Sequence, residues 1–174
     1  MTQHRQAPPT RLFILPWDSE LPWDDDPRSR DTSDDPGWSS GHPGADTTID
    51  VDDPYVEAFW LPLLGPSATW LIRRLIHELR DRPAGFELDL DATAKALGLR
   101  YSRHESTPFV RSIERCVRFG LAREVHADVL EVVTRMPVLV PGRIQRLPAA
   151  ARAAHAAWET GRAAALSSTA GGTR

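Results

Sequence analysis

The alternation of apolar and polar positions is most regular between residues 91 and 135, where it predicts a helix, a turn, a second helix and a β-hairpin. The second helix begins at Ser106-Thr107-Pro108, a hydroxyl cap followed by proline at the first helical position, and ends near Gly120. At 100° per residue, its apolar side chains share one arc and its arginines share a narrow arc nearly opposite. The apolar arc holds Phe109, Val110, Ile113, Cys116 and Val117, and the basic arc holds Arg111, Arg115 and Arg118. One face of this helix suits a core, and the other is cationic.

Three further elements precede this helix. Residues 67–82 predict a longer helix that Ser67 caps, with an apolar arc of leucines and isoleucines and a basic remainder. Residues 86–88 alternate as a short strand, and residues 92–97 form a helix that Asp89 or Asp91 caps and Gly98 closes. These elements supply the first two helices of a three-helix core.

The chain continues after the cationic helix as two strands, at residues 121–125 and 129–135, joined through His126-Ala127-Asp128. The connection before the cationic helix, residues 99–105, adds positive charge through Arg100, Arg103 and His104.

Helices are also predicted on both sides of this core. Asp53-Pro54 leads into a short helix at residues 55–61, which Pro62 is expected to end. Its Phe59 and Trp60 belong to the densest apolar segment, which must be buried against the body or against another subunit. Leu147-Pro148 opens an alanine-rich helix to about residue 159, with Trp158 as a clamp. Residues 161–174 are expected to be a disordered tail.

Residues 1–52 carry many Pro, Asp, Ser, Thr and Gly without sustained periodicity, so we expect a disordered tail. One island, residues 12–26, alternates apolar anchors with carboxylates and repeats a Leu-Pro-Trp-Asp unit that includes Trp17 and Trp23. Three interpretations stay open: a docking motif for a partner, an acidic arm that covers the basic face of the body, and a solubilising tail.

Charge is unevenly distributed, although the formal net charge is only −3. Residues 1–54 hold four arginines against twelve acidic residues, a net of −8, so the remaining residues carry a net of +5. Lys95 is the only lysine among 21 basic residues. Because the whole chain prefers arginine, arginine in place of lysine is weak evidence for base reading.

The single cysteine, Cys116, excludes an intramolecular disulfide and a cysteine-rich zinc site. Its place on the apolar arc predicts a core thiol. The longest apolar run near the N-terminus, residues 12–15, is too short for a signal peptide or a membrane span. The sequence therefore predicts a cytoplasmic protein without a membrane contact.

The order of helix, strand, helix, helix and hairpin across residues 67–135 resembles winged helix-turn-helix proteins. The expected fold is mainly α with a small β-hairpin, a winged helix-turn-helix core in a domain at residues 53–160 with flanking N- and C-terminal helices. The resemblance implies that the third helix enters the major groove of duplex DNA while the wing and loops contact phosphates. By position, the DNA-binding set is Arg111, Ser112, Arg115 and Arg118 in the groove, with Arg100, Arg103 and His104 near the backbone.

Three features weaken this interpretation. Glu114 is within helical reach of Arg118, so part of the arginine arc could serve ordinary ion pairing. The tip of the predicted hairpin at residues 126–128, which would be the wing, carries no arginine or lysine. The net charge of +5 on residues 55–174 is modest for a nucleic-acid module.

Catalytic patterns are incomplete in this sequence. Ser67 lacks the second glycine of a nucleophile elbow, and His77-Glu78 has Asp81 where a zinc-protease pattern requires histidine. No glycine-rich phosphate loop occurs. We therefore expect no enzyme, no catalytic or metal site and no cofactor.

Two functional hypotheses follow. The first is sequence-specific duplex DNA binding, as in a transcriptional regulator. The alternative is a protein-interaction module, an adaptor in a replication or plasmid-maintenance type of assembly, with Trp17, Trp23, Phe59 and Trp60 as partner contacts. A homodimer is also predicted from the apolar segment 55–64 and the C-terminal helix.

Overall fold

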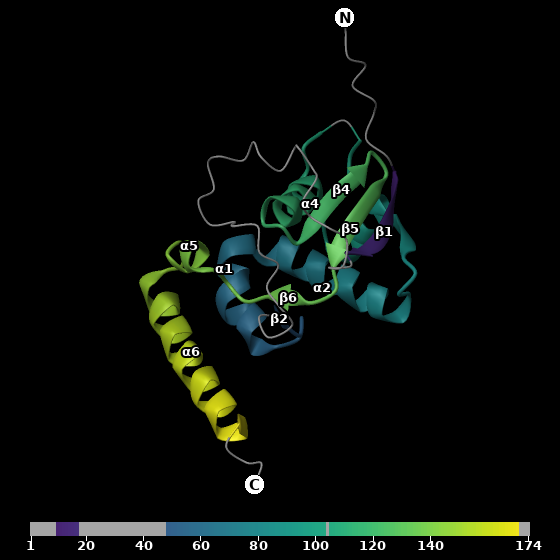
Figure 1. Ribbon diagram of the computed structural model, residues 1–174. Helices are drawn as coiled ribbons and strands as arrows, with labels where there is room; N and C mark the ends of the chain where they lie inside the picture. Colours follow the sequence, from purple (N-terminus) through teal and green to yellow (C-terminus); the bar gives the residue numbers. More distant parts are fainter. Residues whose placement is uncertain (1–9, 18–47, 104, 171–174) are drawn as a thin grey trace, which may run out of the picture.

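The computed structural model describes residues 10–17, 48–103 and 105–170 of the chain (Figure 1). Its helical elements are η4 (Val56–Trp60, a π-helix), α1 (Leu61–Leu64), α2 (Pro66–Asp81), α3 (Leu90–Ala96), α4 (Pro108–Arg118), α5 (Pro141–Ile144) and α6 (Ala149–Ala170). Its strands are β1 (Arg11–Trp17), β2 (Thr48–Ile49), β3 (Phe86–Asp89), β4 (Ala122–His126), β5 (Val129–Val133) and β6 (Met136–Pro137). The expectation of a mainly α chain with a small β region is confirmed.

The caps that the sequence predicts begin two of the central helices. The Asp89 carboxylate accepts from the amide of Ala92 at 2.8 Å and starts α3. The Thr107 hydroxyl accepts from the amide of Val110 at 3.3 Å and starts α4, with Pro108 at the first helical position. Ser67 has no such role, because α2 begins at Pro66 with Gly65 as its N-cap.

Strand β1 corrects the expectation that residues 1–52 are a disordered tail. It lies inside a four-stranded sheet of order β3-β1-β5-β4, antiparallel to β3 and parallel to β5. Ile14 is opposite both Phe86 and Leu130, and all three are buried. A strand with partners on both sides satisfies its backbone groups and buries apolar side chains, which offsets the entropy of ordering it. The domain therefore includes residues 11–17, and residues 18–47 lie outside the described residues.

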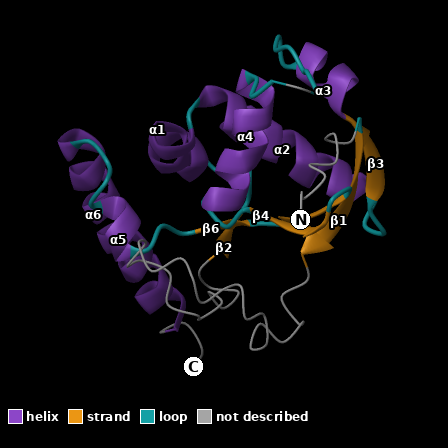
Figure 2. Cartoon of the chain, turned by 90° about the horizontal axis from the view of Figure 1, so that it is seen from above, coloured by secondary structure: helices purple, strands orange, loops and turns teal. Residues whose placement is uncertain are grey.

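Helices α1, α2 and α4 lie on one side of this sheet (Figure 2). Helix α2 buries Leu71, Ile72, Leu75 and Ile76, as its apolar arc predicts, and it packs against α4 and β1. The core of the domain lies between this helical layer and the inward side chains of β1, β3 and β5.

The segment before α2 is one continuous helical stretch and does not end at Pro62. The amide of Leu61 donates to the carbonyl of Val56, a π-type hydrogen bond, and Pro62 then occupies the first turn of α1, where no amide donor is needed. Phe59 and Trp60 are only 4% and 1% exposed, inside the core of this same chain.

Helix α6 is longer than predicted and points away from the sheet (Figure 1). It continues to Ala170. The prediction of a disordered tail is therefore wrong for residues 161–170, and residues 171–174 lie outside the described residues. His155 and Trp158 hold the helix against Tyr55, with the Trp158 and Tyr55 ring centroids 4.5 Å apart. None of the helices in the described ranges is both long and apolar enough to cross a membrane.

Candidate nucleic-acid interface

A shallow pocket of about 390 Å³ lies between α4 and the start of α2. Its first wall is the turn from α1 into α2, residues 64–68, and its second wall is the exposed face of α4. The α4 side chains that line it are Pro108, Arg111, Ser112, Glu114, Arg115 and Arg118. The three arginines of the predicted basic arc therefore face one concave site.

The three arginines are solvent-exposed and follow each other at spacings of four and three residues, which places them on one helical face. Arg111 donates from Nη1 to the carbonyl of Ser106 at 2.9 Å. Among the described residues, none of the three forms an ion pair with a carboxylate. Their positive charge is therefore available to a ligand.

Glu114 and Ser112 differ from the other lining residues of α4. Glu114 lines the pocket but forms no ion pair with Arg118, so the ion pairing considered from the sequence is absent between these two residues. Ser112 was expected to face the DNA groove, and this is wrong. It is 5% exposed, and its hydroxyl donates to the Pro108 carbonyl at 2.9 Å, which leaves it unable to reach a base edge.

The start of α2 adds a second source of positive potential. Gly65 is the N-cap with φ of 75°, and no side chain caps the helix. The first intrahelical hydrogen bond runs from the Thr69 amide to the Gly65 carbonyl at 3.1 Å, so the amides of Ser67 and Ala68 precede it. The first turn of this 16-residue helix has no acidic residue. The positive end of its dipole thus faces the arginines.

Arg115 reaches across to this turn. A Cβ added at Gly65 would lie 3.5 Å from Nη1 of Arg115, so this guanidinium lies beside the turn between α1 and α2. The two walls of the pocket therefore meet at Gly65 and Arg115.

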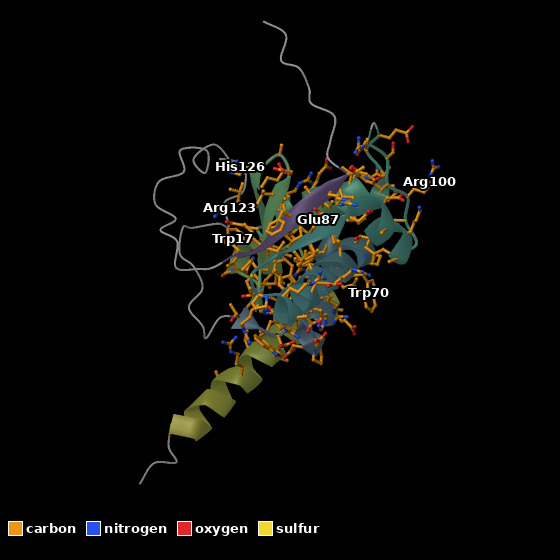
Figure 3. All side chains as sticks on the ribbon, turned by 90° about the vertical axis from the view of Figure 1, so that its right-hand side faces the viewer. Trp17, Trp70, Glu87, Arg100, Arg123 and His126 are labelled. Atoms are coloured by element: carbon orange, nitrogen blue, oxygen red, sulfur yellow. The ribbon has the colours of Figure 1, made fainter. Side chains whose placement is uncertain are left out.

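The other residues of the predicted DNA-binding set do not line this pocket. Arg100 is exposed on the connection after α3 (Figure 3) and is not among the residues that line the pocket. Arg103 is also exposed and donates to the Thr10 hydroxyl. His104 lies outside the described residues. The tip of the β4–β5 hairpin, residues 126–128, is exposed and carries no arginine.

Three of the four predicted partner contacts lie in the described residues, and all three have contacts within the chain itself. Phe59 and Trp60 are core residues, and Trp60 Nε1 donates to the Pro137 carbonyl at 2.8 Å, so their proposed role as exposed partner contacts is wrong. Trp17 ends β1 beneath Arg123, whose guanidinium lies 5.2 Å from the Trp17 ring centroid (Figure 3). Trp23 lies outside the described residues.

Cys116 is a core thiol, as predicted. It is buried beneath α2, and burial raises the pKa of its thiol to about 12. A thiol that remains protonated at neutral pH is a poor nucleophile.

The first wall of the pocket was not found from the sequence. Gly65-Pro66-Ser67 predicted a turn and a cap, and the sequence signal for an open helix start was the absence of an acidic residue in the first turn.

Comparison of the chain with protein-family models, curated proteins and solved structures finds no match.

Proposed function

We propose that the chain binds duplex DNA through α4, as the third helix of a winged helix-turn-helix made by α2, β3, α3, α4 and the β4–β5 hairpin. The observation that carries the proposal is the set of three exposed arginines on one face of α4, which have no carboxylate partner among the described residues. A chain that reads duplex sequence in this way would act as a transcriptional regulator.

The chemistry of this face suits DNA. A helix with its side chains is about 10–12 Å wide, and the major groove of B-form DNA is about 12 Å wide. Guanidinium groups donate two parallel hydrogen bonds to a phosphate or to O6 and N7 of guanine. Among the described residues, the guanidinium groups of Arg115 and Arg118 form no hydrogen bond or ion pair, so both can supply such donors.

The alternative of a protein-interaction module has less support. Two of its four contact residues, Phe59 and Trp60, are buried, and Trp17 is half-buried beneath Arg123. The apolar segment that motivated a homodimer is covered by the same chain.

The test is the affinity of the full chain for a duplex, measured by fluorescence anisotropy. Replacing Arg111 and Arg115 together by alanine should weaken binding by at least about tenfold, because each arginine contact contributes about 1–3 kcal/mol. The control is Arg11→Ala with Arg82→Ala, which removes the same charge from two exposed residues that pair with Glu87 and Glu78. Equal losses in the two double variants would reject a role for the α4 face.

A further inference from the structure

The pocket beside α4 is concave and positively charged, and α4 needs neither property to lie in a DNA groove. Its donors come from two elements that are separated in sequence, α4 and the turn at residues 64–68. Arginine side chains form one wall, and the open start of α2 forms the other. A tetrahedral oxyanion is the chemical group that accepts hydrogen bonds from such donors on several sides.

We propose that this pocket binds a phosphate group, held by the guanidinium groups of Arg115 and Arg118 and closed by the amides of Ser67 and Ala68. The inference rests on the proposed function in so far as the phosphate belongs to DNA. In that complex, one phosphate of the backbone sits in the pocket while the rest of α4 lies in the groove. Inorganic phosphate presents the same kind of anionic oxygen, so we expect it to occupy the site when DNA is absent.

The charges around the pocket favour an anion. Three arginines and one carboxylate, Glu114, line it, which leaves a net of +2 from side chains. The dipole of α2 adds a partial positive charge on the other wall. Arg115 also lies against Gly65, so its guanidinium is already at the junction of the two walls.

Position 67 offers a test that leaves the arginines in place. Ser67→Glu puts a carboxylate at the start of α2, where the helix dipole stabilises it, and beside the arginines, where it competes with phosphate. Ser67→Gln has the same size without the charge, so it measures the steric part of any loss. Glu114→Gln removes the only carboxylate among the lining residues of the described chain and should strengthen binding.

The first arm uses inorganic phosphate as the probe. Thermal unfolding of the full chain is followed in sodium phosphate and in sodium chloride at equal ionic strength, because a bound ligand raises Tm. Phosphate also stabilises proteins by exclusion from their surfaces, so the comparison is between variants. The rise in Tm should be largest in Glu114→Gln, and smaller in Ser67→Glu than in Ser67→Gln.

The second arm uses a DNA duplex. Ser67→Glu should bind at least about tenfold more weakly than Ser67→Gln, and its slope of log affinity against log salt should be shallower by about 0.9, the loss of one phosphate contact. If Ser67→Glu and Ser67→Gln respond alike in both arms, the inference is overturned.

The two arms separate this inference from the proposed function. Duplex binding that needs Arg111 and Arg115, with no effect of the charge at position 67 in either arm, would overturn the phosphate pocket and leave DNA binding intact. A phosphate effect that follows the charge at position 67, in a chain that binds no duplex, would support the pocket and reject the DNA function.

Discussion

At the scale of single residues, His155 is a buried titratable group with a defined partner. It is 0% exposed, and its Nε2 lies 2.7 Å from the Tyr55 hydroxyl, which already accepts from the Leu139 amide at 2.9 Å. Burial raises the pKa of Tyr55 to about 12, so the hydroxyl stays protonated and donates a hydrogen bond to Nε2 of His155. Burial lowers the pKa of His155, and the Glu159 carboxylate opposes this shift in part. The folded state therefore favours the neutral imidazole.

This pair predicts a pH dependence of stability. Because the folded pKa lies below the unfolded value of about 6.5, the stabilising contribution is complete above that pH and is lost as the pH falls towards the folded pKa. The free energy of unfolding should fall more between pH 7 and pH 5 in the wild type than in His155→Gln, as measured by urea denaturation. Both proteins share every other titratable group. Parallel curves in this range would contradict the assignment of a neutral, buried His155.

At the scale of elements, the docking of β1 depends on a glycine. Gly85 has φ of +95°, and a Cβ there would lie 2.6 Å from the carbonyl oxygen of Ile14. Gly98 has φ of +70°, and a Cβ added there would meet no atom within 4 Å. Gly98→Ala therefore strains the backbone in the same way as Gly85→Ala but causes no clash. The two glycines form a matched pair for testing the strand.

Gly85→Ala should destabilise the fold by about 1–3 kcal/mol more than Gly98→Ala, because only the first substitution pushes a methyl group into packed backbone. The loss should be local to β1 and its neighbours. Hydrogen exchange of the amides of residues 11–17 should accelerate in Gly85→Ala and remain slow in Gly98→Ala. Equal exchange in both variants would show that β1 is not held through this contact.

Elements with strong local signals could be predicted from the sequence, and those that depend on distant partners could not. Helix α4 has a cap, a first-position proline and two opposed arcs within eleven residues, and the structure reproduces its bounds. Strand β1 was missed because the composition around it outweighed the four apolar residues at 12–15. Such a short run suits a strand with partners on both sides, but its partners β3 and β5 are more than seventy residues away. The end of α6 was placed too early because Thr160 and Gly161 interrupt a segment of good helix formers.

At the scale of the whole molecule, the candidate site joins segments more than forty residues apart. The arginine arc could be predicted, since helical spacing alone puts residues 111, 115 and 118 on one face. The facing wall at residues 64–68 could not, because the packing of α2 against α4 decides which surface the arginines meet. Packing also explains why Ser112 and Trp60, which the sequence placed on binding surfaces, are buried.

We expect the arginine face of α4 to contact DNA phosphates directly. Each contact to a phosphate changes the slope of log affinity against log salt concentration by about 0.9. The most direct measurement is this slope for the full chain on one duplex, compared with a variant in which Arg111, Arg115 and Arg118 are all alanine. We expect the slope to be shallower in the variant by about one to two, because Arg115 and Arg118 hold one phosphate and Arg111 can add one more contact. A wild-type chain that binds no duplex, or a variant with an unchanged slope, would contradict it.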